Sequence, residues 1–142
     1  MIKQLIFSGS VAHNESIIIE PASIDRIYKV CENLGLTGLK LYTDGGYFFI
    51  AEGSPCAVQT IKEGYEAHPQ LTNLIVLLEN TVEQAEFEDF KIYCGERDVD
   101  VVVPRCFTLD EKGLGAVLTP QTSQMTQILV KTFARVNNLL EA

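Results

Sequence analysis

Few side chains in this sequence combine a reactive type with a spacing that would support catalysis. The only two histidines, His13 and His68, lie far apart, and neither has a sequence neighbour that would complete an acid–base pair. Glu52 follows an apolar run, where burial would raise the pKa of its carboxyl group, but we expect it to position the turn into the next helix. No Gly-rich phosphate loop follows a predicted strand. We therefore predict no catalytic residue and no enzymatic activity.

The cysteines do not indicate a metal site either. Four of them are spread through the sequence, at Cys31, Cys56, Cys94 and Cys106. None forms a Cys-x-x-Cys pair, which is the spacing typical of zinc sites, so we predict no bound metal. The simplest interpretation is that they are reduced, small apolar side chains inside a cytoplasmic protein.

Charge excludes two classes of partner. The 142 residues carry 19 acidic and 11 basic side chains, a formal net charge of −8, and the basic residues are scattered. Nucleic acids and anionic membrane surfaces both require a concentrated basic face, so neither is expected as a partner. The N-terminus has no signal-peptide pattern, and no apolar run is long enough to span a membrane.

Hydrophobic periodicity predicts the elements that would position these residues. The expected order is strand, helix, two strands, helix and two strands: 2–8, a helix opened by Pro21 or Ser23 and ending at Gly35, 38–43, 47–52, a helix from Ser54 to before Pro69, 71–78 and 87–94. An extended run at 17–19 precedes the first helix. Asp44-Gly45-Gly46 is typical of a hairpin turn, and Ser54-Pro55 of a helix start. This order predicts an α+β, ferredoxin-like sandwich: a five-stranded mixed sheet with two helices on one face.

The C-terminal segment, 96–142, is expected to cover the other face of the sheet as part of the same domain. It offers an extended run at 98–103, a weak helix start at 108–111 and a better one at Thr119-Pro120. Apolar residues then recur at helical spacing: Met125, Ile128, Leu129, Phe133, Val136, Leu139 and Leu140. We expect this stripe to pack on the sheet; the alternative is a surface for a partner or for self-association.

Several stretches of the first 95 residues resemble one known family. They are Leu5-Ile6-Phe7-Ser8, Gly35-Leu36-Thr37-Gly38, Ala51-Glu52-Gly53, His68 and 87–92. Together, over residues 2–95, they resemble the BLUF family of blue-light sensors that use FAD. The resemblance implies a BLUF-like domain at 1–95, with a flavin pocket between the two helices.

The resemblance also implies which residues would contact the flavin, and these depart from the family pattern. The family uses a tyrosine on the first strand, a glutamine on the third strand and an asparagine late in the first helix. The matching positions here are Phe7, Phe49 and Cys31. These are the pocket positions if a flavin binds, but they offer it no strong hydrogen bond. We therefore expect no cofactor, and FAD if there is one.

The prediction is a BLUF-like regulatory or protein-interaction module that lacks the photochemistry of the family. Its partner would be another protein or a second copy, with the C-terminal helix as the contact, and a homo-oligomer is expected. One alternative is an FAD-binding blue-light sensor with unusual flavin contacts, including attack on the ring by Cys31. Another is a domain that binds a different small molecule between the two helices.

Overall fold

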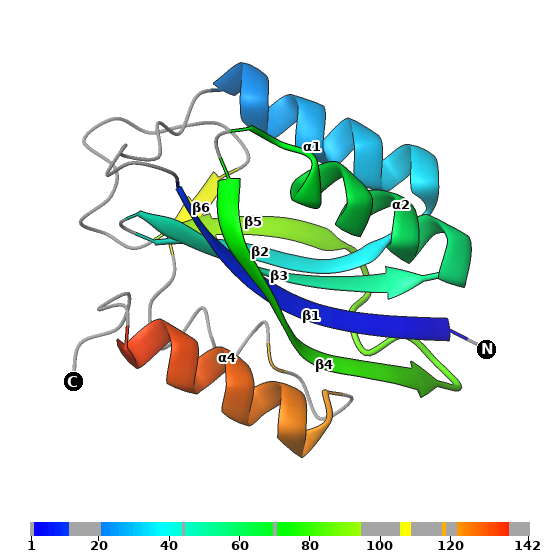
Figure 1. Ribbon diagram of the computed structural model, residues 1–142. Coiled ribbons are helices and arrows are strands. Elements are labelled where there is room, and N and C mark those ends of the chain that lie inside the picture. Colours follow the sequence, from blue (N-terminus) through cyan, green and yellow to red (C-terminus); the bar gives the residue numbers. More distant parts are fainter. Residues whose placement is uncertain are drawn as a thin grey trace.

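The computed structural model describes residues 2–11, 21–43, 45–69, 71–94, 106–108, 118 and 122–136. These ranges contain six strands and three helices (Figure 1), in the order β1 (Ile2–Val11), α1 (Pro21–Leu34), β2 (Thr37–Thr43), β3 (Gly46–Gly53), α2 (Pro55–Glu66), β4 (Leu71–Val82), β5 (Phe90–Cys94), β6 (Cys106–Thr108) and α4 (Gln124–Val136). Predictions were also made above for residues 13, 17–19, 98–103, 109–111, 119–120 and 139–140, which lie outside these ranges.

The strands form one mixed sheet in the order β4-β1-β3-β2-β5-β6. β1 is antiparallel to both β3 and β4, and β2 is antiparallel to β3. β2 and β5 are parallel, as are β5 and the short β6. The predicted α+β, ferredoxin-like fold is confirmed, and the three-residue β6 adds a sixth strand at one edge. The other edge is the long strand β4.

Local sequence explains where the first two helices begin and end. Ser54 precedes α2, and its side-chain oxygen accepts a hydrogen bond from the backbone N–H of Ala57 at 3.1 Å, as the Ser54-Pro55 pair predicts. α1 ends at Gly35, whose φ of +69° is a left-handed conformation that glycine adopts without a steric cost. The N–H of Leu36 then bonds back to the carbonyl of Cys31 at 2.9 Å.

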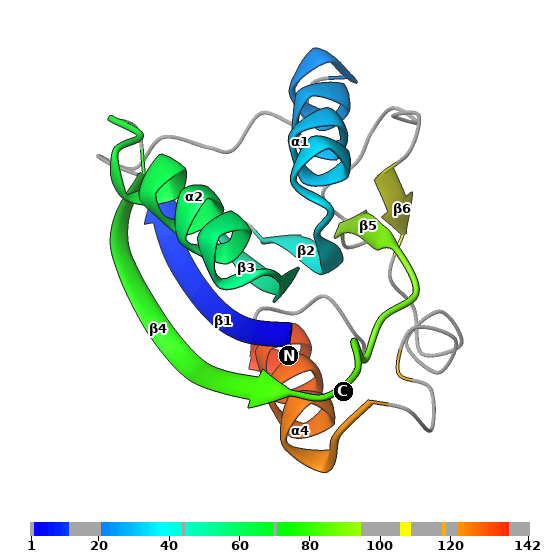
Figure 2. The same ribbon diagram turned by 90° about the vertical axis from the view of Figure 1, so that its right-hand side faces the viewer.

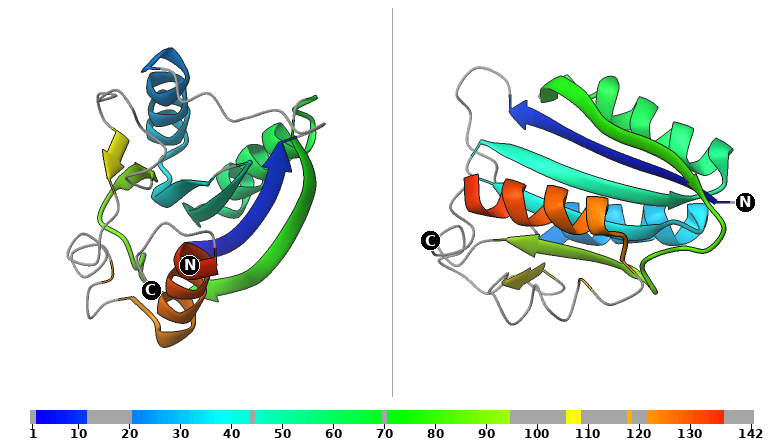
Figure 3. Two further views of the ribbon diagram at one scale, coloured as in Figure 1. Left: turned by 90° about the vertical axis from the view of Figure 1, so that its left-hand side faces the viewer. Right: turned by 90° about the horizontal axis from the view of Figure 1, so that it is seen from below.

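The helices make two layers on opposite faces of the sheet. α1 and α2 cover one face and α4 lies across the other, as Figures 2 and 3 show. β3 is buried on both faces because its side chains alternate between two apolar cores. Tyr47, Phe49 and Ala51 belong to the core under α1 and α2, whereas Phe48 and Ile50 belong to the core under α4.

The predicted C-terminal helix is present but is shifted along the sequence and turned about its axis. It begins at Gln124 rather than Thr119-Pro120, because Ser123 caps it by accepting the N–H of Thr126 at 3.2 Å. Leu129 and Phe133 pack on the sheet as expected. The prediction was wrong for Met125 and Ile128, which are 53% and 51% exposed. The most buried apolar side chains of α4 are instead small ones, Val130 and Ala134.

Candidate functional site

Two of the three predicted pocket residues meet at the centre of the sheet. Phe7 on β1 and Phe49 on β3 are directly paired across the antiparallel ladder, so both side chains point to the face covered by α1 and α2. Both are fully buried. Their rings stack with centroids 5.1 Å apart and an angle of 11° between the planes. This is a close offset-stacking arrangement of two apolar rings.

Tyr65 of α2 closes over this stack. Its ring is nearly perpendicular to both, with centroids 5.5 Å from Phe7 and 5.2 Å from Phe49. Tyr47 lies 5.0 Å from Tyr65, and Phe90 of β5 lies 5.3 Å from Phe49. We call these five residues the aromatic cluster. It fills the space between the sheet and the second helix with rings in mutual contact.

Cys31, the third predicted residue, lies on α1 and is also fully buried in this core. Burial raises the pKa of its thiol to about 12, although the nearby ammonium group of Lys40 acts in the opposite direction. The thiol is therefore protonated at neutral pH, and attack on a bound ring by a Cys31 thiolate is disfavoured.

Lys40 is a residue of the site that the sequence reading missed. It lies on β2 and is only 5% exposed. Its Nζ atom is 4.5 Å from the ring centroid of Tyr42, 4.8 Å from that of Tyr65 and 5.4 Å from that of Tyr47. These are cation–π distances, and such contacts help to offset the cost of burying the ammonium. The hairpin pairing of Lys40 with Phe49 places both on the same face, which is the signal that would have found it.

Two buried phenol groups at this site have no hydrogen-bond partner among the described residues. They are the hydroxyls of Tyr47 and Tyr65. Burial, with a smaller effect of the Glu66 carboxylate, raises the pKa of Tyr47 to about 12, and burial raises the pKa of Tyr65 well above its ordinary value. Both hydroxyls are therefore protonated at neutral pH and able to donate a hydrogen bond. The ring of Tyr47 lies over Gly9, where a side chain would collide with it.

The residues present do not fit a flavin in the way that the resemblance implies. Phe7 and Phe49 have no polar atom, and Cys31 has a protonated thiol that is only a weak donor. The rings of Phe7 and Phe49 contact each other and the ring of Tyr65. The hydroxyls of Tyr47 and Tyr65 are the partnerless polar atoms of this pocket among the described residues.

Glu52 is buried, and its pKa is raised, as expected for an acid that follows an apolar strand. Burial is the main cause, and hydrogen bonds to the carboxylate act in the opposite direction. The predicted role at the turn into α2 was wrong. Its oxygens accept hydrogen bonds from Thr37 Oγ1 at 3.2 Å, Gln4 Nε2 at 3.0 Å and the backbone N–H groups of residues 86 and 87. Glu52 thus faces away from the aromatic cluster.

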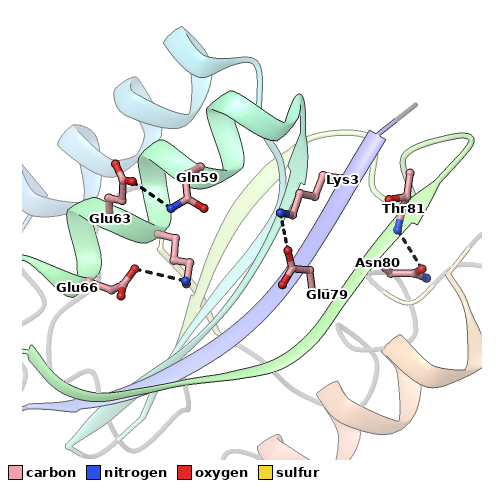
Figure 4. Close-up of polar contacts among 8 residues, drawn as sticks. Lys3, Gln59, Glu63, Glu66, Glu79, Asn80 and Thr81 are labelled. Carbon is pink, nitrogen blue, oxygen red and sulfur yellow. Dashed lines mark hydrogen bonds and ion pairs between the residues drawn. The ribbon is translucent and has the colours of Figure 1, made fainter.

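Two ion pairs lie nearer the surface. The ion pairs Lys3–Glu79, at 2.5 Å between β1 and β4, and Lys62–Glu66, at 3.5 Å within α2, are drawn in Figure 4. His68 is exposed after the end of α2. Within the ranges that the structure covers, no group of three or more histidine, cysteine or carboxylate side chains is arranged to hold a metal ion. No helix in those ranges is long and apolar enough to cross a membrane.

Solved structures match this fold over most of the chain. No family model and no curated protein matches the sequence. BlrP1 of Klebsiella pneumoniae, in a complex with manganese and cyclic diGMP, matches with a TM-score of 0.71 and 20% identity, over 96% of this chain and 33% of that one. A bacterial light-regulated adenylyl cyclase matches with a TM-score of 0.60 and 17% identity, over 98% of this chain and 35% of that one.

A match to a shorter solved structure identifies the class of this fold. BlrB, a BLUF protein in its dark state, matches with a TM-score of 0.56 and 19% identity, over 68% of this chain and 74% of that one. This protein therefore has the fold of BLUF proteins, as the sequence resemblance implies. The chain spans about a third of the length of the BlrP1 chains that it matches.

The likeness extends beyond the region of the sequence that resembles BLUF. The BLUF part of BlrP1 alone matches 65% of this chain, whereas the longer BlrP1 chain matches 96%.

Proposed function

We propose that this chain is a regulatory or protein-interaction module with the BLUF fold that does not use flavin photochemistry. The observation that carries the proposal is the stack of Phe7 on Phe49 beneath Tyr65. Neither phenylalanine can exchange a proton or rearrange hydrogen bonds, so these two positions cannot carry a light-driven switch of the kind that the family resemblance describes.

Energetics favour the filled pocket over a bound flavin. Burial of each phenylalanine contributes roughly 1.5 to 3 kcal/mol. A flavin in the same place would have to separate the stacked rings, and each polar edge atom left without a partner would cost roughly 1 to 3 kcal/mol. Both effects act against binding.

The partner in this proposal is another protein or a second copy of the chain, and in the second case the chain forms a homo-oligomer. The module acts in the cytoplasm and has no catalytic role of its own. The outward face of α4 supports a protein contact, because it exposes Met125 and Ile128 one helical turn apart. Light scattering coupled to size-exclusion chromatography would measure the oligomeric state. A single monomeric species at all concentrations would contradict the self-association part of the proposal.

An absorption spectrum tests the central claim. The protein would be purified from cells supplied with extra flavin, and its spectrum recorded in darkness and after blue light. We expect no flavin band. A band that does not respond to light would limit the proposal to loss of photochemistry, and a band that shifts under light and recovers in darkness would overturn it.

A second candidate function is binding of a flavin with unusual contacts, or of another small molecule, between α1 and α2. The partnerless hydroxyls of Tyr47 and Tyr65 favour it, because buried donors without partners are often satisfied by a bound group. A ligand screen by thermal shift would test this candidate. Tyr65→Phe, which removes only the hydroxyl, should abolish the shift caused by a ligand at this site. Tyr93→Phe, in the core on the opposite face of the sheet, is the matched control.

A further inference from the structure

A second buried polar group lies on the opposite face of the sheet, where α4 begins. Glu86, only 8% exposed, stands in the segment between β4 and β5. Its carboxylate accepts one hydrogen bond from the backbone N–H of Ser123, the residue that caps α4. It accepts another from Gln4 Nε2 on β1, at 2.5 Å. One side chain therefore joins the start of the helix to the sheet.

Glu52 holds the backbone at Glu86 from the sheet side. Its Oε2 atom accepts the backbone N–H of Glu86 at 2.9 Å, and its Oε1 atom accepts that of Phe87 at 3.0 Å. Gln4 Nε2 donates to both carboxylates. The connection thus runs from β3 through the backbone at Glu86 to α4, and we call Gln4, Glu52 and Glu86 the buried junction.

The apolar contacts of α4 begin after its first turn, at Leu129 and Val130. Among the residues of α4 whose burial is described, the fully buried side chains are those of Thr126, Val130 and Ala134, none of them large. The ring of Phe133 contacts that of Phe48, with centroids 4.7 Å apart, and Phe133 is itself only partly buried. The first turn of α4 contributes no large side chain to the apolar core, because Met125 is exposed and the buried residue is Thr126, so the attachment of this turn to the sheet depends on its polar contacts.

The buried junction is also electrostatically suited to holding a helix start. A carboxylate near a helix N-terminus is stabilised by the unpaired N–H groups and by the helix dipole. The same region carries two buried atoms with no partner among the described residues, Gln4 Oε1 and Thr122 Oγ1. Partnerless buried polar atoms raise the free energy of the closed arrangement, so its margin over an open one is reduced.

We propose that α4 is a releasable cover of the sheet and that Glu86 is the latch that holds its first turn closed. Release uncovers the apolar side chains beneath it, which include Ile6, Leu39, Leu41, Phe48 and Ile50. This regulation of the C-terminal helix does not depend on whether the pocket between α1 and α2 binds a ligand.

Hydrogen exchange of the full-length chain, followed by mass spectrometry, tests the latch. Glu86→Gln keeps the shape of the side chain but turns an N–H₂ group toward one of its two donors. We expect exchange in α4 to become at least about tenfold faster, because hydrogen bonds to a charged group are lost, while β1 and β3 exchange as before. Glu88→Gln, an exposed position two residues away, is the matched control and should leave α4 unchanged.

Three results would overturn the latch. The first is unchanged exchange in α4 of Glu86→Gln. The second is acceleration in β1 and β3 by the same factor as in α4, since that would report loss of the whole fold. The third is equal loosening by Ser123→Ala, which removes the cap on Thr126 but keeps the N–H that Glu86 accepts. If Glu86→Gln does not fold, Glu86→Asp, which keeps the charge but shortens the reach, must give the same local acceleration.

Discussion

Gly9 lies against the ring of Tyr47, whereas Gly64 faces open space. A Cβ atom at Gly9 would lie 2.5 Å from the hydroxyl oxygen of Tyr47 and 2.7 Å from two of its ring carbons. Nothing lies within 4 Å of the corresponding atom at Gly64, which is inside α2.

These two glycines predict opposite effects of the same substitution. Gly9→Ala should lower the free energy of unfolding by about 1–3 kcal/mol, because the buried Tyr47 ring has to move. Gly64→Ala should raise it by about 0.5–1 kcal/mol, because alanine is the better helix former and meets no atom. Urea unfolding of both variants measures the difference. Equal effects would contradict the packing of Tyr47 over Gly9.

Glu52 makes the stability of the fold depend on pH. The pKa of Glu52 is raised in the folded protein. Its contribution to the free energy of unfolding is therefore greatest below the ordinary pKa of glutamic acid, and it is lost as pH rises through the raised pKa. Glu52→Gln should be less stable by about 1–3 kcal/mol, because its amide faces a hydrogen-bond donor. The loss should be larger near about pH 4 than near about pH 8. Urea unfolding across this range measures it, and a loss that grows with pH would contradict the assignment.

The sequence allowed those pocket residues to be identified that lie in strands and helices with a recognisable pattern. Phe7 and Phe49 were expected at the pocket because the family resemblance implies those positions, and the structure brings them into contact. Lys40 was missed because a lysine within an apolar strand is ordinarily placed on the solvent face. Glu86 was missed because it lies between elements, where no periodicity indicates which side chains turn inward.

Helices are predictable here to the extent that their start is encoded locally. α2 begins where Ser54-Pro55 indicates, because cap and proline act within one turn. The sequence just before α4 offers three serine or threonine residues, Thr119, Thr122 and Ser123, and does not by itself indicate which one caps the helix. Its buried face depends on the sheet beneath, so the exposure of Met125 and Ile128 could not be read from spacing alone.

The Ser54 cap can be tested at the level of the helix. Ser54→Ala should lower the free energy of unfolding by about 1 kcal/mol, because the N–H of Ala57 loses its acceptor. Ser54→Asp keeps an acceptor at the same position and should retain most of the stability. Thermal and urea unfolding would measure both variants. If the aspartate variant is as unstable as the alanine variant, the hydrogen bond is not the cause.

The whole molecule follows the predicted layer order because both faces of its central strands are apolar. A sheet with two apolar faces requires a cover on each, which is why helices on one side and a C-terminal segment on the other could be expected. The short strand β6 could not be predicted, because three residues that pair at the edge of a sheet are too few to show a periodic pattern.

Removal of the second cover should make the molecule unstable as a separate unit. A chain that ends after residue 95 lacks both β6 and α4 and exposes the apolar side chains that α4 covers. We expect it to aggregate or to bind anilinonaphthalene sulfonate strongly, whereas the full chain should not, because a large exposed apolar patch is an association site. Light scattering and dye fluorescence measure this. A monodisperse truncated chain with normal stability would show that 1–95 is an independent domain.

The positions of the tyrosines make the intrinsic fluorescence of the protein sensitive mainly to one of its two cores. The chain has no tryptophan and five tyrosines, so its intrinsic ultraviolet emission comes from tyrosine alone. Tyr28, Tyr42, Tyr47 and Tyr65 belong to the core under α1 and α2, and only Tyr93 belongs to the core under α4. Emission intensity and near-ultraviolet circular dichroism thus report mainly on one side of the sheet. Because the chain has no tryptophan, Phe133→Trp would add tryptophan fluorescence that reports on the core under α4. The two cores could then be followed separately during unfolding.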